Sequence, residues 1–488
     1  MERNVKFLRR EYRKALLPVM LSVLGGTVNT LIDSAFVSRR LDADALAAIS
    51  LNMPIFLVLC MIGCLFGVGS FVAASRSLGE KKENEAEGYF HTAVLGSVLI
   101  SILFMIAGIF FSDEVGIALC RDHNLLSLVQ DYCRITLIGA LPYILVYIPT
   151  YFLQLCGKAR EMTAMMVIMI ATDILFDWLM LYIFDEGIAG AAVASVLSIL
   201  IATIYGFAVL QKRSRLYRLS NFRFSLFGLK YVIYFGSSSA FGSLMDVVRM
   251  YLLNVIIYDS GGASALALWA VINSLLEISL SITSGVPRTA APLLGIFLGE
   301  HDNEGARSLV QLQLKVGFVL SLAFGLLIVI FNYPIGVFFK IQDPVLVPFI
   351  CLAVSVLLET TCSILGSFYN VAKRVFLSNF VMLMRTFVFA LVFARIMLIQ
   401  EWLIWLFLPC SMGMTLIATL LIARGMAART KGREHELSYP LLLDDYLEKH
   451  DQVKGFSIIS SNEGICQASE DIIGFCMEHG MDRKKGTR

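Results

Sequence analysis

Charged residues are scarce in this chain of 488 residues. Asp, Glu, Lys and Arg together make up 16% of it, whereas hydrophobic residues make up 57%. Soluble domains carry about 25% charged residues, so this composition cannot cover the surface of a soluble protein. It predicts an all-α, polytopic membrane protein whose main surroundings are the lipid bilayer.

Motifs of several other protein classes are missing as well. The ten cysteines show no metal-ligand spacing, since Cys60 and Cys64 stand four apart without a His or carboxylate beside them. No G-x-x-x-x-G-K-[ST] loop is present to hold nucleotide phosphates, which argues against an ATP-driven pump. Residues 1–14 are basic, but the following apolar run is longer than a signal-peptide core. We therefore expect no cleaved signal peptide, no cofactor and no nucleic-acid partner.

Two stretches of the chain repeat each other. The first opens at Ala45-Leu46-Ala47 and ends at Leu78-Gly79-Glu80. The second opens at Ala265-Leu266-Ala267 and ends at Leu298-Gly299-Glu300. Corresponding positions are 220 residues apart, without a gap. Two similar halves made of apolar helices are typical of transporters in which one half moves against the other.

Twelve apolar segments have the length of about 20 residues that a membrane-spanning helix needs. They fall at 15–37, 45–75, 91–111, 132–155, 162–184, 188–210, 231–258, 263–286, 308–331, 346–369, 379–399 and 402–427. The sequence therefore predicts two six-helix lobes (1–210 and 231–428), a cytoplasmic linker (211–230) and a partly disordered cytoplasmic tail (429–488). Within the tail, 462–478 has the pattern of one amphipathic helix.

Basic residues gather on one side of these predicted spans. That side holds the six in 1–14 and then Arg76, Lys81, Lys82, Lys158, Arg160, Lys212, Arg213, Arg215, Arg218, Arg223, Lys230, Arg307, Lys373, Arg374, Arg424, Arg429, Lys431 and Arg433. The other side holds Arg39, Arg40, Arg121 and Lys340. Because cytoplasmic loops are enriched in Lys and Arg, both termini are predicted to be cytoplasmic, and the two lobes to be parallel repeats.

Three carboxylates fall inside predicted spans of the first lobe. Asp33 lies in the first span, while Asp173 and Asp177 lie four apart on one face of the fifth. No Lys or Arg stands mid-span in this lobe, and an ionisable group at mid-bilayer is costly. Three clustered carboxylates cannot all be ionised without a bound cation, so at least one is expected to hold a proton. This indicates an ion-coupled transporter; structural pairing of the acids with waters is the alternative.

Other polar residues in the spans are weaker candidates. Pro18 is expected to bend the first helix near the acids, with a static kink as the alternative. Candidates for a substrate cavity are Asn254, Asp246, Glu277, Glu359, Met165 and Met169. Each of these acids either lines the cavity or holds helices together. Arg385 is a further interior candidate, which likewise either lines the cavity or holds helices together. Asp246 can pair with Arg249, Asn254 can hydrogen-bond between helices, and the methionines also suit ordinary helix packing.

Four stretches share their order and spacing with a known transporter family. They are Leu31-Ile32-Asp33 with Leu41 and Ala45–Ile49; Gly67–Glu80; Asp177 with Gly187–Ser195; and Asn254 with Ala265–Ala267, Pro292 and Leu298–Glu300. Through them, residues 10–428 resemble the multidrug and toxic compound extrusion (MATE) family, and its DNA-damage-inducible (DinF-like) branch in particular.

The resemblance implies a fold of the MOP superfamily, with twelve transmembrane helices in two pseudo-symmetric six-helix lobes. It also implies a bacterial-type plasma membrane protein that exports cationic or amphipathic drugs by antiport with H+ or Na+, as a monomer and not as an enzyme. The family's cation site carries over to Asp33, Asp173, Asp177 and Ser195, where Na+ is the one metal ion expected, with Pro18 as the bending proline. Asp173 stands where the family usually has Asn, and Ser195 where it usually has Thr, so the stoichiometry stays open.

Two other functions remain as alternatives. The same superfamily contains flippases for lipid-linked saccharides, whose anionic carriers favour a cavity lined by Arg and Lys. More remotely, Asp173-x-x-x-Asp177 could hold Mg²⁺ for a diphosphate in an intramembrane prenyltransferase-type enzyme, but a second acidic motif is missing.

Overall fold

The computed structural model describes residues 2–41, 43–120, 123–214, 216–217, 226–338, 346–397, 405–431 and 437–444. It divides into two compact units, Met1–Ile422 and Ala423–Arg488. Both predicted lobes fall in the first unit except for the end of the last helix. The amphipathic helix predicted at 462–478 lies outside the described residues.

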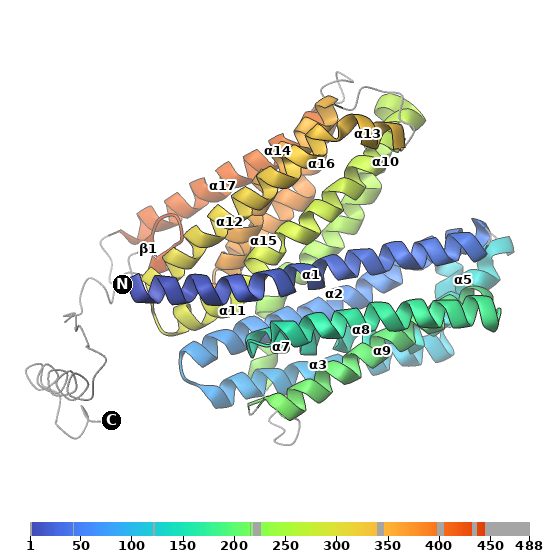
Figure 1. Cartoon of the computed structure of the whole chain (residues 1–488), viewed down its shortest axis with the longest axis horizontal. Coiled ribbons are helices and arrows are strands. Elements are labelled where there is room, and N and C mark those ends of the chain that lie inside the picture. The colour runs from blue at the N-terminus through green and yellow to red at the C-terminus, as the bar shows by residue number, and fades with distance from the viewer. Residues whose placement is uncertain are drawn as a thin grey trace, which may run out of the picture. The chain divides into compact units, whose positions relative to one another are not determined.

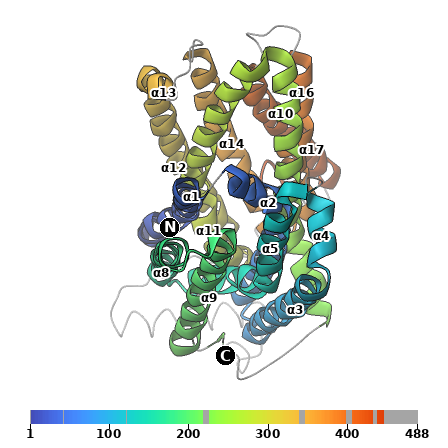
Figure 2. The same cartoon turned by 90° about the vertical axis from the view of Figure 1, so that its right-hand side faces the viewer.

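The first lobe consists of helices shown in blue to green in Figure 1. They are α1 (Glu2–Arg40), α2 (Ala43–Gly79), α3 (Glu83–Phe110), α4 (Ser112–Leu119), α5 (His123–Ile138), α6 (Ala140–Leu145), α7 (Tyr147–Leu155), α8 (Ala159–Trp178), the π-helical turn η1 (Leu179–Ile183) and α9 (Gly187–Arg213). Figures 1 and 2 both show α1 running beside α8.

The second lobe begins with the long element α10, which contains two apolar spans. Its elements are α10 (Leu226–Thr283), α11 (Gly285–Gly299), α12 (Asn303–Ile330), α13 (Asn332–Phe338), α14 (Leu346–Val371), α15 (Val375–Leu383), the π-helical turn η2 (Met384–Val388), α16 (Phe389–Met397) and α17 (Phe407–Thr430). In the second unit, β1 (Leu437–Ser438) and β2 (Leu443–Asp444) form a short antiparallel pair.

Every predicted span coincides with helical residues, but the structure breaks the fourth span and extends the eighth. Among the described residues, ten helices are long and apolar enough to cross a membrane. Helix α1 is not one of these ten, but it coincides with the first predicted span. The fourth span is broken by a bend of 55° between Ile138 and Ala140. Gly139 lies at this break, where a Cβ would collide with the side chain of Val196 from α9. The close approach of α9 therefore explains why glycine is needed there.

The eighth span extends further than the sequence predicted. The prediction ended it at residue 286, before Pro287 and Arg288, whereas the structure continues it through α11 to Gly299. Proline is tolerated in the first turn of a helix because its missing N–H would have no partner there. The new helix begins at Gly285, so Pro287 falls in that turn. Arg288 is consequently inside the span and not in a loop.

The two repeated Leu-Gly-Glu sequences meet where α2 crosses α11. A Cβ added to Gly79 would lie 2.8 Å from the Cα atom of Gly299, and one added to Gly299 would lie 2.7 Å from that of Gly79. Each would also collide with a carbonyl three residues before the opposite glycine, at Ile296 and Arg76 respectively. Corresponding residues of the two repeats therefore contact each other symmetrically, and only glycine permits this closeness.

Ionic contacts also join the lobes beside this crossing. Glu80, just after α2, lies 2.8 Å from Lys82 Nζ and 3.8 Å from Lys373 Nζ of the second lobe. Partial burial would raise the pKa of Glu80, but the hydrogen bond from Lys82 and the neighbouring positive charges hold it below its usual value. We call this end of the first unit, with the turns at 80–82, 300–302 and 372–374, the basic end.

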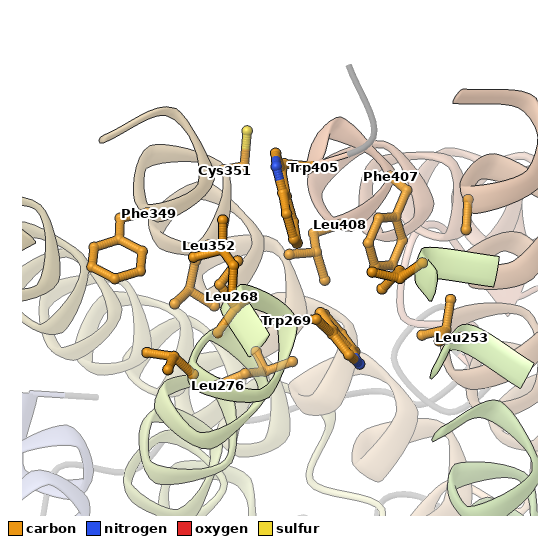
Figure 3. Packing of buried hydrophobic residues seen from close by; sticks show 14 of the residues in the cluster. Leu253, Leu268, Trp269, Leu276, Phe349, Cys351, Leu352, Trp405, Phe407 and Leu408 are labelled. Atoms are coloured by element: carbon orange, nitrogen blue, oxygen red, sulfur yellow. The ribbon is translucent and has the colours of Figure 1, made fainter. Parts of the chain in front are cut away.

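The cores of the two lobes are apolar. Figure 3 shows the second-lobe core, in which Trp269 lies among Leu253, Phe407 and other buried side chains. Trp269 Nε1 donates a hydrogen bond to Asn254 Oδ1 over 3.0 Å. Trp269 belongs to the eighth predicted span and Asn254 to the seventh, and both lie in α10, so this hydrogen bond joins two parts of one helical element.

The α2–α11 crossing predicts that added volume at its glycines destabilises the fold. Gly79→Ala and Gly299→Ala should each lower the unfolding temperature, since overpacking costs about 1–3 kcal/mol. The matched control is Gly26→Ala in α1, where a Cβ would meet nothing within 4 Å. Thermal unfolding of the purified protein in detergent measures all three. Equal unfolding temperatures for Gly299→Ala and the parent would contradict the tight crossing.

Candidate functional site

Two buried carboxylates occupy one face of α8. Asp173 and Asp177 are one helical turn apart, with exposed fractions of 0% and 2%. No ion pair among the described residues involves either of them. The prediction of two stacked acids without a basic partner in this lobe is thus matched by the structure. We refer to them as the acid pair.

Asp173 is held by donors from two neighbouring helices. Asn29 Nδ2 of α1 donates to its Oδ2 over 2.6 Å, and Ser198 Oγ of α9 donates to its Oδ1 over 2.8 Å. Neither donor was predicted from the sequence. These two donors position Asp173 as a hydrogen-bond acceptor between α1 and α9.

Asp177 has fewer hydrogen-bond donors among the described residues than Asp173. Its Oδ2 atom is buried and has no hydrogen-bond partner among the described residues. The π-helical turn η1 begins two residues later, and such turns are frequent at functional sites. A buried carboxylate oxygen without a donor is a position where a proton or a cation is favoured.

Among the described side chains, no hydrogen bond joins the acid pair to the other two predicted members of the cation site, Asp33 and Ser195. Asp33 lies in α1 one helical turn after Asn29, but its side chain is outside the described ones. Ser195 Oγ donates to the Ala191 carbonyl of its own helix over 3.3 Å. The α9 hydroxyl that donates to the acid pair therefore belongs to Ser198, three residues further along the helix.

Pro18 lies where α1 contacts α8. Its carbonyl accepts hydrogen bonds from Ser22 Oγ over 2.9 Å and from Thr163 Oγ1 of α8 over 2.8 Å. Helix α1 continues through Pro18 as one helix. The proline therefore marks a fixed contact between α1 and α8, about ten residues from Asn29 along the chain.

In the second lobe, the predicted acids differ in their surroundings. Glu359 is buried and forms a close ion pair with Arg385, which lies in η2. Asp246 pairs with Arg249 over 3.1 Å, as the sequence predicted, and is 53% exposed. Glu277 is exposed. The Glu359–Arg385 pair thus holds α14 against η2.

A cavity of about 210 Å³ lies between the lobes. Its lining includes Phe71 of α2 and Tyr151 of α7 from the first lobe, and Arg288 and Arg385 from the second. We call it the inter-lobe cavity. Of the residues that the sequence suggested for a substrate cavity, Arg385 lines it. The others do not: Asn254 contacts Trp269, Met165 is buried in the first-lobe core, Met169 packs against that core, and the three acids are not among the lining residues.

The long apolar helices of the two lobes define a polytopic membrane protein. The MatE family model matches residues 18–179. The multidrug export protein MepA of Staphylococcus aureus (strain MRSA252) is 25% identical over 198 residues, which are 41% of this chain and 44% of MepA. MepA of Staphylococcus saprophyticus subsp. saprophyticus is 24% identical over 189 residues, or 39% of this chain and 42% of that protein. The matched segment thus covers less than half of these relatives.

Solved structures of MATE proteins match much more of the chain. An outward-facing multidrug resistance MATE transporter of the MOP superfamily aligns with a TM-score of 0.79 and 20% identity over 88% of this chain and 98% of that one. A MATE protein in a straight conformation gives 0.80 and 20% over 88% and 99%. A MOP superfamily transporter from Pyrococcus furiosus, described as having a binding pocket of reverse polarity, gives 0.78 and 21% over 88% and 98%.

These likenesses confirm the predicted polytopic all-α fold. The family model and the MepA relatives show that the first part of this chain is similar to MATE proteins. The DinF-like branch stays a prediction.

The hydrogen bonds to Asp173 predict a difference between two serines of α9. Ser198→Ala removes a donor from a buried carboxylate, which costs about 1–3 kcal/mol, and should lower the unfolding temperature. Ser195→Ala is the matched control, because that hydroxyl contacts only a carbonyl of its own helix. Thermal unfolding in detergent compares them. An equal loss in both variants would argue against the Ser198–Asp173 contact.

Proposed function

We propose that this chain is a secondary active transporter of the plasma membrane that exports cationic or amphipathic small molecules by antiport with H+ or Na+. The observation that carries the proposal is the acid pair: two buried carboxylates without an ion-pair partner among the described residues. The names of the MepA relatives, which are multidrug export proteins, agree with it.

The geometry of the acid pair suits reversible binding of one cation. Asp173 already accepts from Asn29 and Ser198, whereas Asp177 Oδ2 has no donor. Two carboxylates one turn apart repel each other when both are ionised, so a proton or Na+ beside Asp177 lowers the energy of the pair. Asp33, one turn beyond Asn29, completes the site in this proposal.

The direction of transport follows from the basic end. Under the positive-inside rule this end faces the cytoplasm, and so do both termini. The α2–α11 crossing and the Glu80–Lys373 contact hold the lobes together there. The described conformation is then closed toward the cytoplasm, which is the state in which an exporter releases substrate outside and takes up its coupling cation.

Removing single carboxylates tests the role of the proposed site. Asp177→Asn and Asp33→Asn should each lower gradient-driven transport at least about tenfold, since a neutral amide cannot exchange a cation. Uptake of a fluorescent cationic dye into inside-out vesicles measures transport, with a Na+ gradient alone and with a proton gradient alone. Asp185→Asn, which changes a carboxylate that is 73% exposed in a loop, is the control. Parental transport by Asp177→Asn and Asp33→Asn would refute the coupling mechanism.

Asp173 is expected to behave differently from Asp177. Asp173→Asn keeps an acceptor for Asn29, and the Ser198 hydroxyl can turn to accept from the new amide. Transport should therefore persist, while fewer cations are exchanged per substrate molecule because one negative charge is gone. The stoichiometry is measured in proteoliposomes by finding the opposing substrate gradient that stops net flux. An unchanged stoichiometry would place the exchanged cations on other carboxylates.

A further inference from the structure

Arg288 is a cation in the inter-lobe cavity that no carboxylate neutralises among the described residues. It lies in α11 within the eighth span. Its Nη2 atom donates to Tyr151 Oη over 2.6 Å, and its guanidinium carbon lies 5.1 Å from the centre of the same ring. Tyrosine supplies a hydrogen bond and a cation–π contact but carries no full negative charge.

The second arginine of the cavity is different. Arg385 forms an ion pair with the buried Glu359, which does not line the cavity. No Asp or Glu is among the residues that line it. The cavity wall therefore carries one positive charge in excess, on Arg288, inside a span where unpaired charge is costly.

The remaining polar lining consists mostly of hydroxyl groups. Serines from three helices and from the turn between α10 and α11 line the cavity: Ser238, Ser239, Ser284, Ser363, Ser367 and Ser378. Hydroxyls can donate hydrogen bonds to an acidic oxygen, and a guanidinium binds carboxylate or phosphate through a planar fork. Phe71, Val72 and Met382 add apolar surface to the same wall.

We propose that the inter-lobe cavity binds an acidic group of an amphipathic substrate, with Arg288 as its positively charged contact. The substrate class is then amphipathic molecules that carry a carboxylate, sulfonate or phosphate, with or without a cationic part. The cavity volume of about 210 Å³ is large enough for such a group. This inference rests on the proposed transport function and narrows its substrates.

A matched pair of probes tests the inference without any ion gradient. Dansylglycine and dansylglycinamide share fluorophore and size, but only the first carries a negative charge. Their binding to the full chain in phosphatidylcholine nanodiscs is followed by dansyl fluorescence. We expect the parent to bind the acid at least about tenfold more tightly than the amide. Equal affinities of the parent for both probes would overturn the proposal.

Arg288 variants assign that preference to one residue. Arg288→Gln should bind the two probes equally, and Arg288→Lys should keep part of the preference because its charge remains. Retained binding of dansylglycinamide shows that each variant is folded. Lys315→Gln removes a positive charge from an exposed position of α12 outside the cavity and is the matched control. A parental preference in Arg288→Gln would overturn the proposal.

Two further arms separate the alternatives. If Arg288 served only to join the lobes through Tyr151, then Tyr151→Phe would abolish the preference for the acid as Arg288→Gln does. We expect the preference to persist in Tyr151→Phe.

Adding phosphatidylglycerol to the nanodiscs should weaken dansylglycine binding if lipid phosphate is the natural occupant. Binding should be unchanged if the natural occupant is a soluble acid. Asp177→Asn should still prefer the acid, so failure of ion coupling and failure of this site are distinguishable.

Discussion

The cost of holding charge between apolar helices governs how each lobe is built. Such a charge needs an opposite charge, donors or a bound ion. In the second lobe two acids have basic partners, because Glu359 pairs with Arg385 and Asp246 pairs with Arg249, whereas Arg288 has only Tyr151 as its side-chain partner among the described residues. In the first lobe, Asn29 and Ser198 donate to Asp173, while one oxygen of Asp177 is left without a donor among the described residues. The lobes therefore differ in the sign of the buried charge that has no oppositely charged partner among the described residues: it is acidic in the first lobe and basic in the second.

This difference is imposed on a symmetric scaffold. The repeats contact each other at Gly79 and Gly299, and the turns that follow place Lys81 and His301 at φ angles of 58° and 60°. The fifth span of each lobe contains a π-helical turn, η1 or η2. Beside the first stands an acid, Asp177, and within the second stands a base, Arg385. Charges of opposite sign thus lie near the two π-helical turns, although not at equivalent positions of the repeat.

The sequence predicted the acid pair but not its partners, for a geometrical reason. Asp173 and Asp177 lie on one helix, where a spacing of four places both on one face. Ser195 and Ser198 are about 60° apart around α9, so only the packing of α9 on α8 decides which one meets Asp173. Asn29 was missed because its contact depends on how α1 is rotated. Helix spacing alone carries no information about either rotation.

The sequence prediction missed Arg288 because it ended the eighth span before this residue. A proline followed by a charge resembles the end of a span, and the predicted eighth span stopped at 286. In the structure Pro287 lies in the first turn of α11, where its lack of an N–H is harmless. The side chain that gives the inter-lobe cavity its charge thus fell into a predicted loop. The predicted cavity residues were charged residues, an asparagine and two methionines inside predicted spans, and of these Arg385 alone is among the lining residues of the cavity.

Helix α1 contacts both the acid pair of the first lobe and the second lobe. Asn29 donates to Asp173, while Thr27, two residues earlier, contacts Ser281 of α10 over 2.6 Å. Residues two apart project from a helix in different directions, so α1 contacts α8 on one side and the opposite lobe on another. Tyr12 near its start also donates to the Val286 carbonyl over 3.1 Å. In the proposed mechanism, α1 is therefore the element that touches both the acid pair and the interface between the lobes.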